Sequence, residues 1–233
     1  MPRVQDLVQL SFSPPQAKHI CDPNGGWYQP FMLGATTGGL VDETWTYASS
    51  TTVTVTTDAT TRYQKGQKVR FKQGGSYKYF YIVAVAATTL TLAAGSDYSV
   101  ANAAITDVNI SNAEVAFGFP ATFTYTPTYT GSGTLAFGTV AAVPRFFIVN
   151  GNCILNIYPL GTVSGTGVEI RFSLPVTSHN NDPGGGAWIE DTIGPGGSWY
   201  MLDTNTIAVR SYNAANWNTG ASKGFRLTAI YKI

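Results

Sequence analysis

Charged residues are scarce in this chain of 233 residues, of which only 12% are Asp, Glu, Lys or Arg. That share is about half of the roughly 25% typical of soluble domains. Lys plus Arg number 14 and Asp plus Glu number 13, so the formal net charge of +1 gives no overall attraction to nucleic acid or to a membrane surface. Because so few charged residues are present to cover the outside, we expect part of the surface to be hidden in a subunit interface.

Long apolar runs and cysteines are also few. The longest apolar run, Tyr79 to Ala87, has 9 residues, whereas a membrane-spanning helix needs about 20. The first ten residues mix polar and apolar types and do not resemble the apolar core of a secretory signal. Cys21 and Cys153 are the two cysteines, without CxxC spacing. We therefore expect a protein that folds in a reducing cytosol with two free thiols, a disulfide being the alternative.

Residues for catalysis are sparse as well. The two histidines are His19 and His179, and no G-x-S-x-G motif presents a serine to either. Two histidines and two cysteines scattered along the chain do not provide the closely spaced ligands of a zinc site. Glu190 and Asp191 are adjacent, so in a strand they point to opposite faces and cannot flank one glycosidic bond. Glu169 could form a catalytic carboxylate pair with one of them only if the fold brings the two together. The sequence predicts no enzyme, no cofactor and no metal.

Residues 1–34 differ from the rest of the chain. Val4, Leu7 and Val8 recur at helical spacing, which predicts a short N-terminal helix. Such a helix either packs on its own domain or serves as an anchor that docks into another protein.

Residues 35–115 have the pattern of a small Thr-rich β module. Nine of the 18 residues from Thr44 to Thr61 are threonine, which favours strands. Apolar and basic residues alternate from Lys68 to Lys72, and a continuous apolar strand from Tyr79 to Val85 is expected to be buried on both faces. Thr88 to Leu92 gives a further strand, and the spacing predicts a small β-barrel or sandwich.

Residues 116–233 read as a second β domain, with Asn109 to Phe123 as a junction. The expected strands are Arg145 to Val149, Cys153 to Tyr158, Val168 to Leu174, Thr206 to Tyr212 and Phe225 to Ile233. The expected glycine-rich loops are Gly161 to Gly167, Gly184 to Gly186 and Gly194 to Gly197. This pattern predicts a C-terminal antiparallel jelly-roll-like β-sandwich, so that the whole chain is all-β after its N-terminal helix.

Two features suggest ligand binding. Lys68, Arg70 and Lys72 share one face of a strand, where they could meet phosphates or acidic sugars, or form a solvated strand protected against edge pairing. The C-terminal domain also concentrates aromatic and amide side chains that stack on sugars and bond hydroxyls, unless the rings belong to the core or to subunit contacts. These candidates for glycan or receptor binding are Trp188, Trp199, Tyr200, Tyr212, Asn213, Asn216 and Trp217.

The chain resembles a tailed-bacteriophage virion protein of the fibre or spike kind, of head-fibre or tail-fibre type. The resemblance is carried by the opening residues 1–10, by the β pattern of residues 52–83, and by residues 123–175. The stretch from Arg210 to Trp217 is similar to the closing part of the receptor-binding head domains of such proteins.

The resemblance implies a homotrimer, assembled in the host cytoplasm and located in the virion. Its N-terminus would be held by capsid or tail proteins, and its C-terminal loops would bind a host surface polysaccharide. The near-neutral charge and the short apolar runs predict no nucleic-acid partner and no membrane insertion. The alternatives are a capsid decoration or adaptor protein without receptor binding, and a carbohydrate-binding module.

Overall fold

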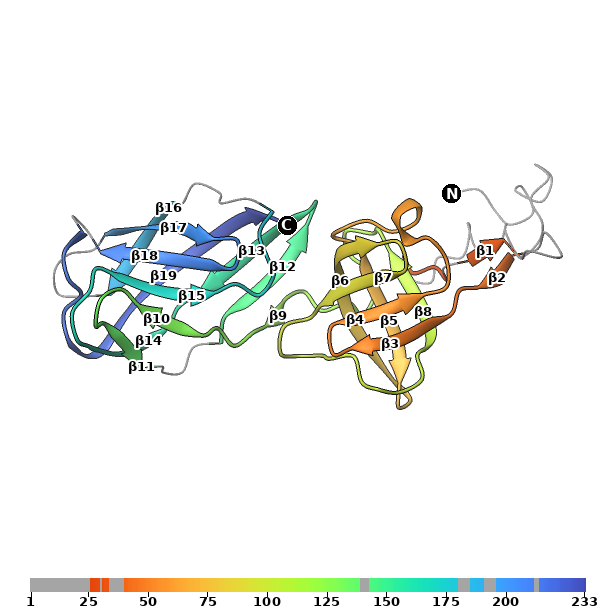
Figure 1. Cartoon of the computed structure of the whole chain (residues 1–233), viewed down its shortest axis with the longest axis horizontal. Coiled ribbons are helices and arrows are strands. Elements are labelled where there is room, and N and C mark those ends of the chain that lie inside the picture. The colour runs from red at the N-terminus through yellow and green to blue at the C-terminus, as the bar shows by residue number, and fades with distance from the viewer. Residues whose placement is uncertain are drawn as a thin grey trace. The chain divides into compact units, whose positions relative to one another are not determined.

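The computed structural model describes residues 26–29, 31–33, 40–138, 143–179, 185–190, 196–211 and 214–233, and their side chains except at 31–33, 40–42 and 185–190 (Figure 1). The predicted N-terminal helix with Val4, Leu7 and Val8 lies outside these residues, as does Cys21. Within them the chain is all-β apart from short 3₁₀ turns, and every strand pairing is antiparallel. The all-β prediction is confirmed. None of the described segments is a helix long and apolar enough to cross a membrane.

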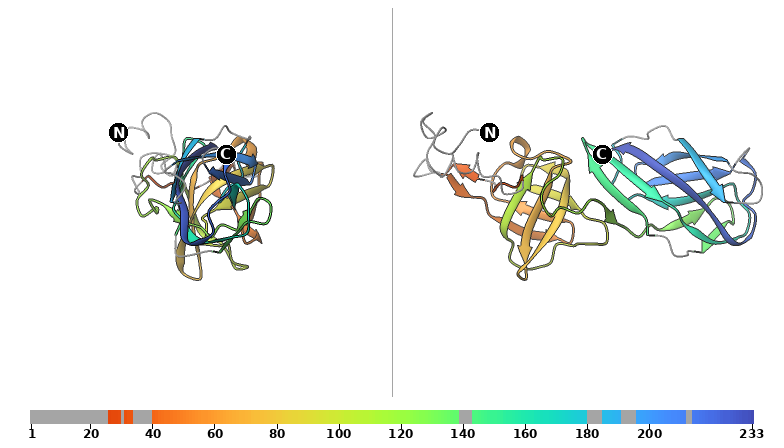
Figure 2. Two further views of the ribbon diagram at one scale, coloured as in Figure 1. Left: turned by 90° about the vertical axis from the view of Figure 1, so that its left-hand side faces the viewer. Right: turned by 180° about the vertical axis from the view of Figure 1, so that it is seen from behind.

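The chain divides into two compact units. The N-terminal unit comprises Met1–Leu92 and Tyr98–Pro120, and the C-terminal unit comprises Ala93–Asp97 and Ala121–Ile233 (Figure 2). The sequence placed the boundary between residues 115 and 116, five residues before the boundary after Pro120. Asp97 belongs to the C-terminal unit because its carboxylate accepts hydrogen bonds from the backbone N–H and the hydroxyl of Thr124.

The N-terminal unit is built on a six-stranded sheet in the order β3-β4-β7-β6-β5-β8. Its strands are β3 (Trp45–Ser49), β4 (Thr52–Val55), β5 (Lys68–Gln73), β6 (Ser76–Ala86), β7 (Thr89–Ala93) and β8 (Thr106–Ser111). The 3₁₀ turn η1 spans Ala59–Thr61, and β1 (Phe31–Leu33) pairs with β2 (Leu40–Asp42). In the core, the Phe71 and Phe80 rings stack with their centroids 5.0 Å apart.

Two expectations for this unit need correction. The strand from Tyr79 to Val85 is not buried on both faces along its length, because only Phe80, Tyr81 and Ile82 are buried. From Val83 to Ala86 the residues of β6 alternate between half-buried and exposed, so one face of this end of the strand is open to solvent. The expected junction from Asn109 also begins inside a strand, β8, which pairs with β5.

The C-terminal unit contains an eleven-stranded curled sheet. Its main path runs β10-β15-β18-β17-β16-β19-β13-β12-β9, and β14 pairs with both β11 and β19. The ring of Phe172 in β15 stacks on the ring of Phe225 in β19, with the two ring centroids 5.6 Å apart, although three strands separate β15 from β19 along the sheet. The sheet must therefore curl so that these two strands face each other across the core. The strands are β9 (Phe123–Thr124), β10 (Tyr129–Gly131), β11 (Ala136–Gly138), β12 (Arg145–Val149), β13 (Asn152–Ile157), β14 (Leu160–Ser164), β15 (Glu169–Ser173), β16 (Gly185–Glu190), β17 (Gly197–Asp203), β18 (Thr206–Ser211) and β19 (Gly220–Lys232).

Glycine was misleading as a loop signal in this unit. The expected loop Gly161 to Gly167 contains most of β14, and β16 and β17 each begin at a glycine that was assigned to a loop. A Cβ on Gly161 would lie 2.2 Å from the carbonyl oxygen of Gly138. Glycine is required here because β14 packs closely against a neighbouring backbone, not because the chain turns.

Candidate functional site

The basic residues of β5 lie on one face, and each faces a tyrosine of β6. The three cross-strand pairs are Lys68 with Tyr81, Arg70 with Tyr79, and Lys72 with Tyr77. Cations lying against aromatic rings gain from the negative ring face and lose part of their hydration. The predicted basic row is therefore present, but it lies against an aromatic layer of the same unit.

Arg70 is buried, with 7% of its surface exposed. Its guanidinium lies between the rings of Trp27 and Tyr77, with Cζ 4.6 Å from each ring centroid. Trp27 is held in turn by a 2.7 Å hydrogen bond from its indole N–H to the carbonyl oxygen of Phe117. A guanidinium enclosed in this way is not accessible to a large anionic ligand.

Lys68 and Lys72 also have partners. Lys68 Nζ donates to the carbonyl oxygens of Ala113 (2.8 Å) and Glu114 (3.1 Å), and burial lowers the pKa of Lys68. Lys72 Nζ lies 2.8 Å from an Asp107 carboxylate oxygen, and hydrogen bonds from Lys72 and Tyr77 lower the Asp107 pKa to about 2. Since β5 lies between β6 and β8, its lysines do not protect a sheet edge, and that interpretation is wrong.

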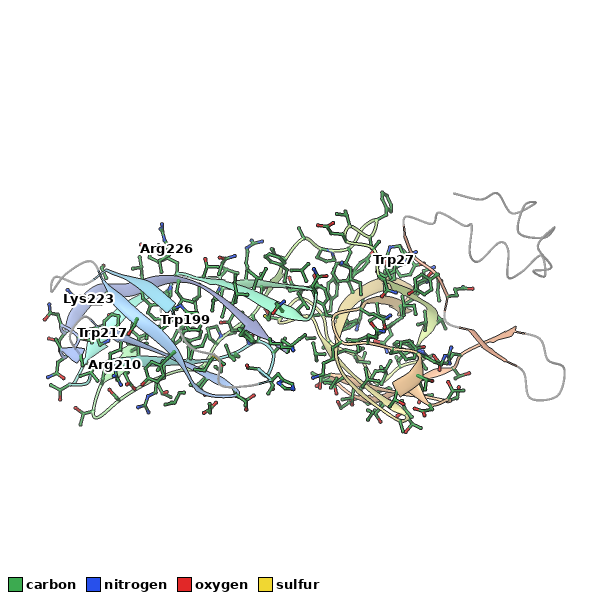
Figure 3. The ribbon with its side chains drawn as sticks, turned by 90° about the horizontal axis from the view of Figure 1, so that it is seen from above. Trp27, Trp199, Arg210, Trp217, Lys223 and Arg226 are labelled. Carbon is green, nitrogen blue, oxygen red and sulfur yellow. The ribbon has the colours of Figure 1, made fainter. Side chains whose placement is uncertain are left out.

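Two of the three tryptophans proposed for glycan stacking, Trp199 and Trp217, lie in the interior of the C-terminal unit (Figure 3). Trp199 is 6% exposed and Trp217 is 2% exposed. A buried ring has no free face for a sugar, so the structure favours the alternative, that both belong to the core. Asn216 is exposed, whereas Tyr212, Asn213 and the side chain of Trp188 fall outside the described part of the chain.

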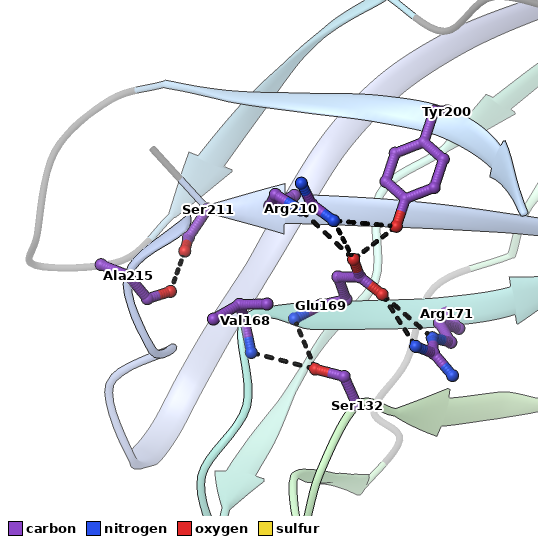
Figure 4. A network of polar contacts seen from close by, with 8 residues as sticks. All are labelled: Ser132, Val168, Glu169, Arg171, Tyr200, Arg210, Ser211 and Ala215. Atoms are coloured by element: carbon purple, nitrogen blue, oxygen red, sulfur yellow. Dashed lines mark hydrogen bonds and ion pairs between the residues drawn. The ribbon is translucent and has the colours of Figure 1, made fainter. Parts of the chain in front are cut away.

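Tyr200 differs from the tryptophans because it belongs to a polar cluster on the outer face of the C-terminal unit (Figure 4). At its centre is Glu169, which is 4% exposed. Arg171 donates to Oε2 of Glu169 from Nε (3.1 Å) and Nη2 (2.9 Å), and Arg210 donates to Oε1 from Nε (3.2 Å) and Nη2 (2.6 Å). The Tyr200 hydroxyl donates to Oε1 as well. We call Glu169, Arg171, Tyr200 and Arg210 the arginine cluster.

Strand alternation and register position this cluster. Ile170 and Phe172 of β15 are fully buried, so Glu169 and Arg171 project from the opposite face. Glu169 pairs across strands with Arg210 of β18, and Tyr200 of β17 lies one row further along, opposite Ala208. Alternation over this strand was predicted, with one face in the core and the other wet, and the pattern is confirmed except that Glu169 itself is covered.

The electrostatics of the cluster keep Glu169 ionised. Burial alone would raise the Glu169 pKa, but hydrogen bonds from Tyr200, Arg210 and Arg171, with the Arg171 charge, lower it to about 2 from an ordinary 4.5. Burial and the neighbouring carboxylate raise the pKa of Tyr200. At neutral pH the cluster therefore carries two positive charges and one negative charge. A carboxylate held ionised by two arginines is no proton donor, so the cluster suits recognition and not acid catalysis.

The arginines remain partly open to solvent. The exposed side-chain fraction is 42% for Arg210 and 31% for Arg171. Both guanidiniums use Nε and Nη2 on Glu169, so the Nη1 donors of both remain without a protein partner among the described residues. The Arg210 guanidinium also lies 5.2 Å from the Tyr200 ring centroid.

Arg171 and Arg210 were not identified from the sequence. A signal was present for one of them, because Glu169 and Arg171 stand two positions apart in a strictly alternating strand. Arg210 joins them only through the pairing of β15 with β18, which local pattern does not reveal. Over the described residues, no group of three or more His, Cys, Asp or Glu side chains is placed to hold a metal ion.

Comparison of the chain with protein-family models, with curated proteins and with solved structures finds no match. The candidate site therefore rests on the geometry of its own residues.

Proposed function

We propose that this chain is a structural protein of a tailed-bacteriophage particle, a homotrimeric fibre or spike that binds a host cell-surface glycan. Its C-terminal unit is the receptor-binding, jelly-roll-like head of the proposal, and its N-terminal residues are the anchor to capsid or tail proteins. The observation that carries the glycan-binding part is the arginine cluster, which displays partly exposed guanidinium groups and a tyrosine on the outer face of a sheet.

Several features of the cluster suit a sugar ligand. Sugar hydroxyls and carboxylates are recognised by fixed planar donors, and aromatic rings pack on the apolar faces of sugars. The side chains stand on paired strands and are fixed by Glu169, so binding need not order a loop. This display on a sheet replaces the tryptophans as the centre of the proposed site.

A second candidate, a capsid decoration or adaptor protein without receptor binding, is favoured by a different observation. Trp199 and Trp217, which the glycan hypothesis needed on the surface, are buried. In that case the arginine cluster only stabilises the sheet, and the chain is neither a receptor-binding protein nor a carbohydrate-binding module.

The experiment has two parts. Light scattering coupled to size-exclusion chromatography should give a mass of about 75 kDa, three times 24.9 kDa, for the proposed trimer. The purified full chain should then bind one or more polysaccharides on a bacterial glycan array. A mass near 24.9 kDa would overturn the homotrimer. A trimer that binds no polysaccharide would support the decoration protein instead.

A matched pair of variants assigns the binding to the cluster. Tyr200→Ala should weaken glycan binding by about tenfold or more, a change of roughly 1.4 kcal/mol. Asn216→Ala removes an exposed amide of the same unit, outside the cluster, and should leave binding within about twofold. If only Asn216→Ala weakens binding, the site lies on the C-terminal loops and not at the cluster.

A further inference from the structure

We infer that the arginine cluster selects a glycan that carries sugar carboxylates, with Arg171 and Arg210 as the residues that bind the carboxylate. This inference rests on the proposed function, since it names the class of sugar that the same site would take.

The cluster carries an excess of positive charge. Arg171 and Arg210 contribute two positive charges and Glu169 one negative charge, so one positive charge is left without a counterion inside the cluster. Among the described strands β10, β15, β17 and β18, the one further acid is Asp203. Its carboxylate accepts a hydrogen bond from the backbone N–H of Asn205, and it lies opposite Thr206 at the end of β17. An anionic ligand would supply the missing counterion.

The strand neighbours of the two guanidiniums leave them open to a ligand. The cross-strand neighbours of Arg171 are Thr130 and Ala208, and Ser198 lies beside Arg210 on the side away from Glu169. These residues are small and uncharged, so they neither compete for the guanidiniums nor cover them.

Both guanidiniums are held in place before any ligand binds. Glu169 binds each guanidinium through Nε and Nη2, which fixes both planes and directs the Nη1 donors away from the carboxylate. Guanidinium donors held in a plane form strong charge-assisted hydrogen bonds with a carboxylate, and little side-chain entropy remains to be lost on binding. The enclosed Arg70 of the other unit, at 7% exposure, shows the contrasting case of a guanidinium used within the fold.

The test compares two forms of one polymer. The probe is a polysaccharide rich in glucuronate, and the control is the same polysaccharide after chemical reduction of its carboxyl groups to alcohols. The full chain should bind the acidic form at least about tenfold more tightly than the reduced form. Raising NaCl from about 50 mM to about 500 mM should weaken the binding, because salt screens exposed charges. This salt titration uses the unmodified protein and does not depend on how any variant folds.

Variants connect the preference to the two arginines. Arg171→Gln and Arg210→Gln should each weaken binding of the acidic polymer by about tenfold and should reduce the preference for the acidic over the reduced polymer. Arg226→Gln is the control, because Arg226 is an exposed arginine of β19 that stacks on Tyr158, outside the cluster.

Each outcome has a distinct meaning. Equal binding of both polymers, or full binding by both cluster variants, overturns the carboxylate inference and leaves glycan attachment standing. Preference for a polyol-phosphate polymer over the glucuronate polymer also overturns it, in favour of phosphate. Absence of binding to any polysaccharide overturns the inference together with the proposed function.

Discussion

The guanidinium carbon of Arg70 lies 4.6 Å from the centroid of the Trp27 ring. This contact attaches the segment of residues 26–29 to the sheet face of the N-terminal unit, where Trp27 also packs near Tyr79 and Phe119. A cation enclosed by rings interacts with them more strongly than an exposed one, because less water screens the attraction.

Replacement of Arg70 by Lys should therefore destabilise the N-terminal unit by about 1–2 kcal/mol, since lysine keeps the charge but loses the planar group that stacks on both rings. Urea unfolding, with pulsed hydrogen exchange to assign each transition to a unit, measures this. Arg226→Lys is the matched control, because Arg226 stacks on Tyr158 at 4.4 Å but is exposed, and it should cost less than about 0.5 kcal/mol. Equal costs at the two sites would show that burial does not strengthen the Arg70 contact.

The buried Glu43 should be one of the most sensitive positions in the N-terminal unit. Its carboxylate accepts hydrogen bonds from Trp45 (3.0 Å), Thr57 (2.6 Å), Arg62 (2.6 Å) and the hydroxyl of Tyr63, and its side chain is 0% exposed. Glu43→Ala leaves these donors and one cation without their acceptor and should cost about 3–5 kcal/mol of unfolding free energy.

A second acid of the same unit provides the comparison for Glu43. Asp107→Asn alters the Lys72 pair, whose side chains are 38% and 32% exposed, and it should cost less than about 1 kcal/mol. If the two substitutions prove equally costly in urea unfolding, burial of Glu43 is not what makes its network strong.

Acid should weaken the C-terminal unit through Glu169. Its pKa is about 2 in the folded chain and 4.5 ordinarily, so ionisation favours the folded state. The resulting stabilisation is fully present above pH 4.5 and is lost as the pH falls towards 2. Glu169→Gln cannot ionise, so it should cost about 1–3 kcal/mol at neutral pH, and this deficit should shrink below pH 4.5.

Urea unfolding of both proteins at several pH values measures that difference. Asp107 also titrates at low pH, but it is present in both proteins and cancels in the comparison. A deficit that stays constant down to pH 2 would contradict an ionised Glu169 in the folded state.

Two glycines of paired strands, Gly161 and Gly138, should differ in how well they tolerate replacement by alanine. A Cβ on Gly161 would lie 2.2 Å from the Gly138 carbonyl oxygen and 2.8 Å from Phe137 Cζ, so Gly161→Ala must move backbone and should cost about 2 kcal/mol or more. A Cβ on Gly138 meets nothing closer than 3.6 Å, and Gly138→Ala should be neutral within about 0.5 kcal/mol. Thermal melts of the two variants give the comparison, and similar melting temperatures would refute the close approach at Gly161.

Strands in which apolar and polar residues alternate regularly could be predicted from the sequence, because this alternation is visible within a few consecutive residues. The segment from Arg145 to Val149 coincides with β12, and Val168 to Leu174 brackets β15. Strands whose first or second residue is glycine were hard to predict, because the same residue marks turns and close backbone approach. β14, β16 and β17 were missed for this reason.

The candidate site was predicted less well than the strands. Whether Trp199 and Trp217 are buried depends on how their segments face a core that is built by distant parts of the chain. Their residue type alone suggested that they stack on sugars. Tyr200 was proposed from the sequence as a glycan-binding residue, but its hydrogen-bond partners Glu169 and Arg210 come from two other strands, β15 and β18. A register between strands far apart in sequence is the information that a single sequence lacks.

The position of β19 has a consequence for the synthesis of the protein. It pairs with β13, β14 and β16, and all three precede it in the chain. During translation these strands leave the ribosome before their common partner, so their hydrogen-bonding edges stay open for several seconds. The nascent C-terminal unit therefore passes through an interval in which it is prone to pair with other chains, and chaperones that shield strand edges should raise its yield.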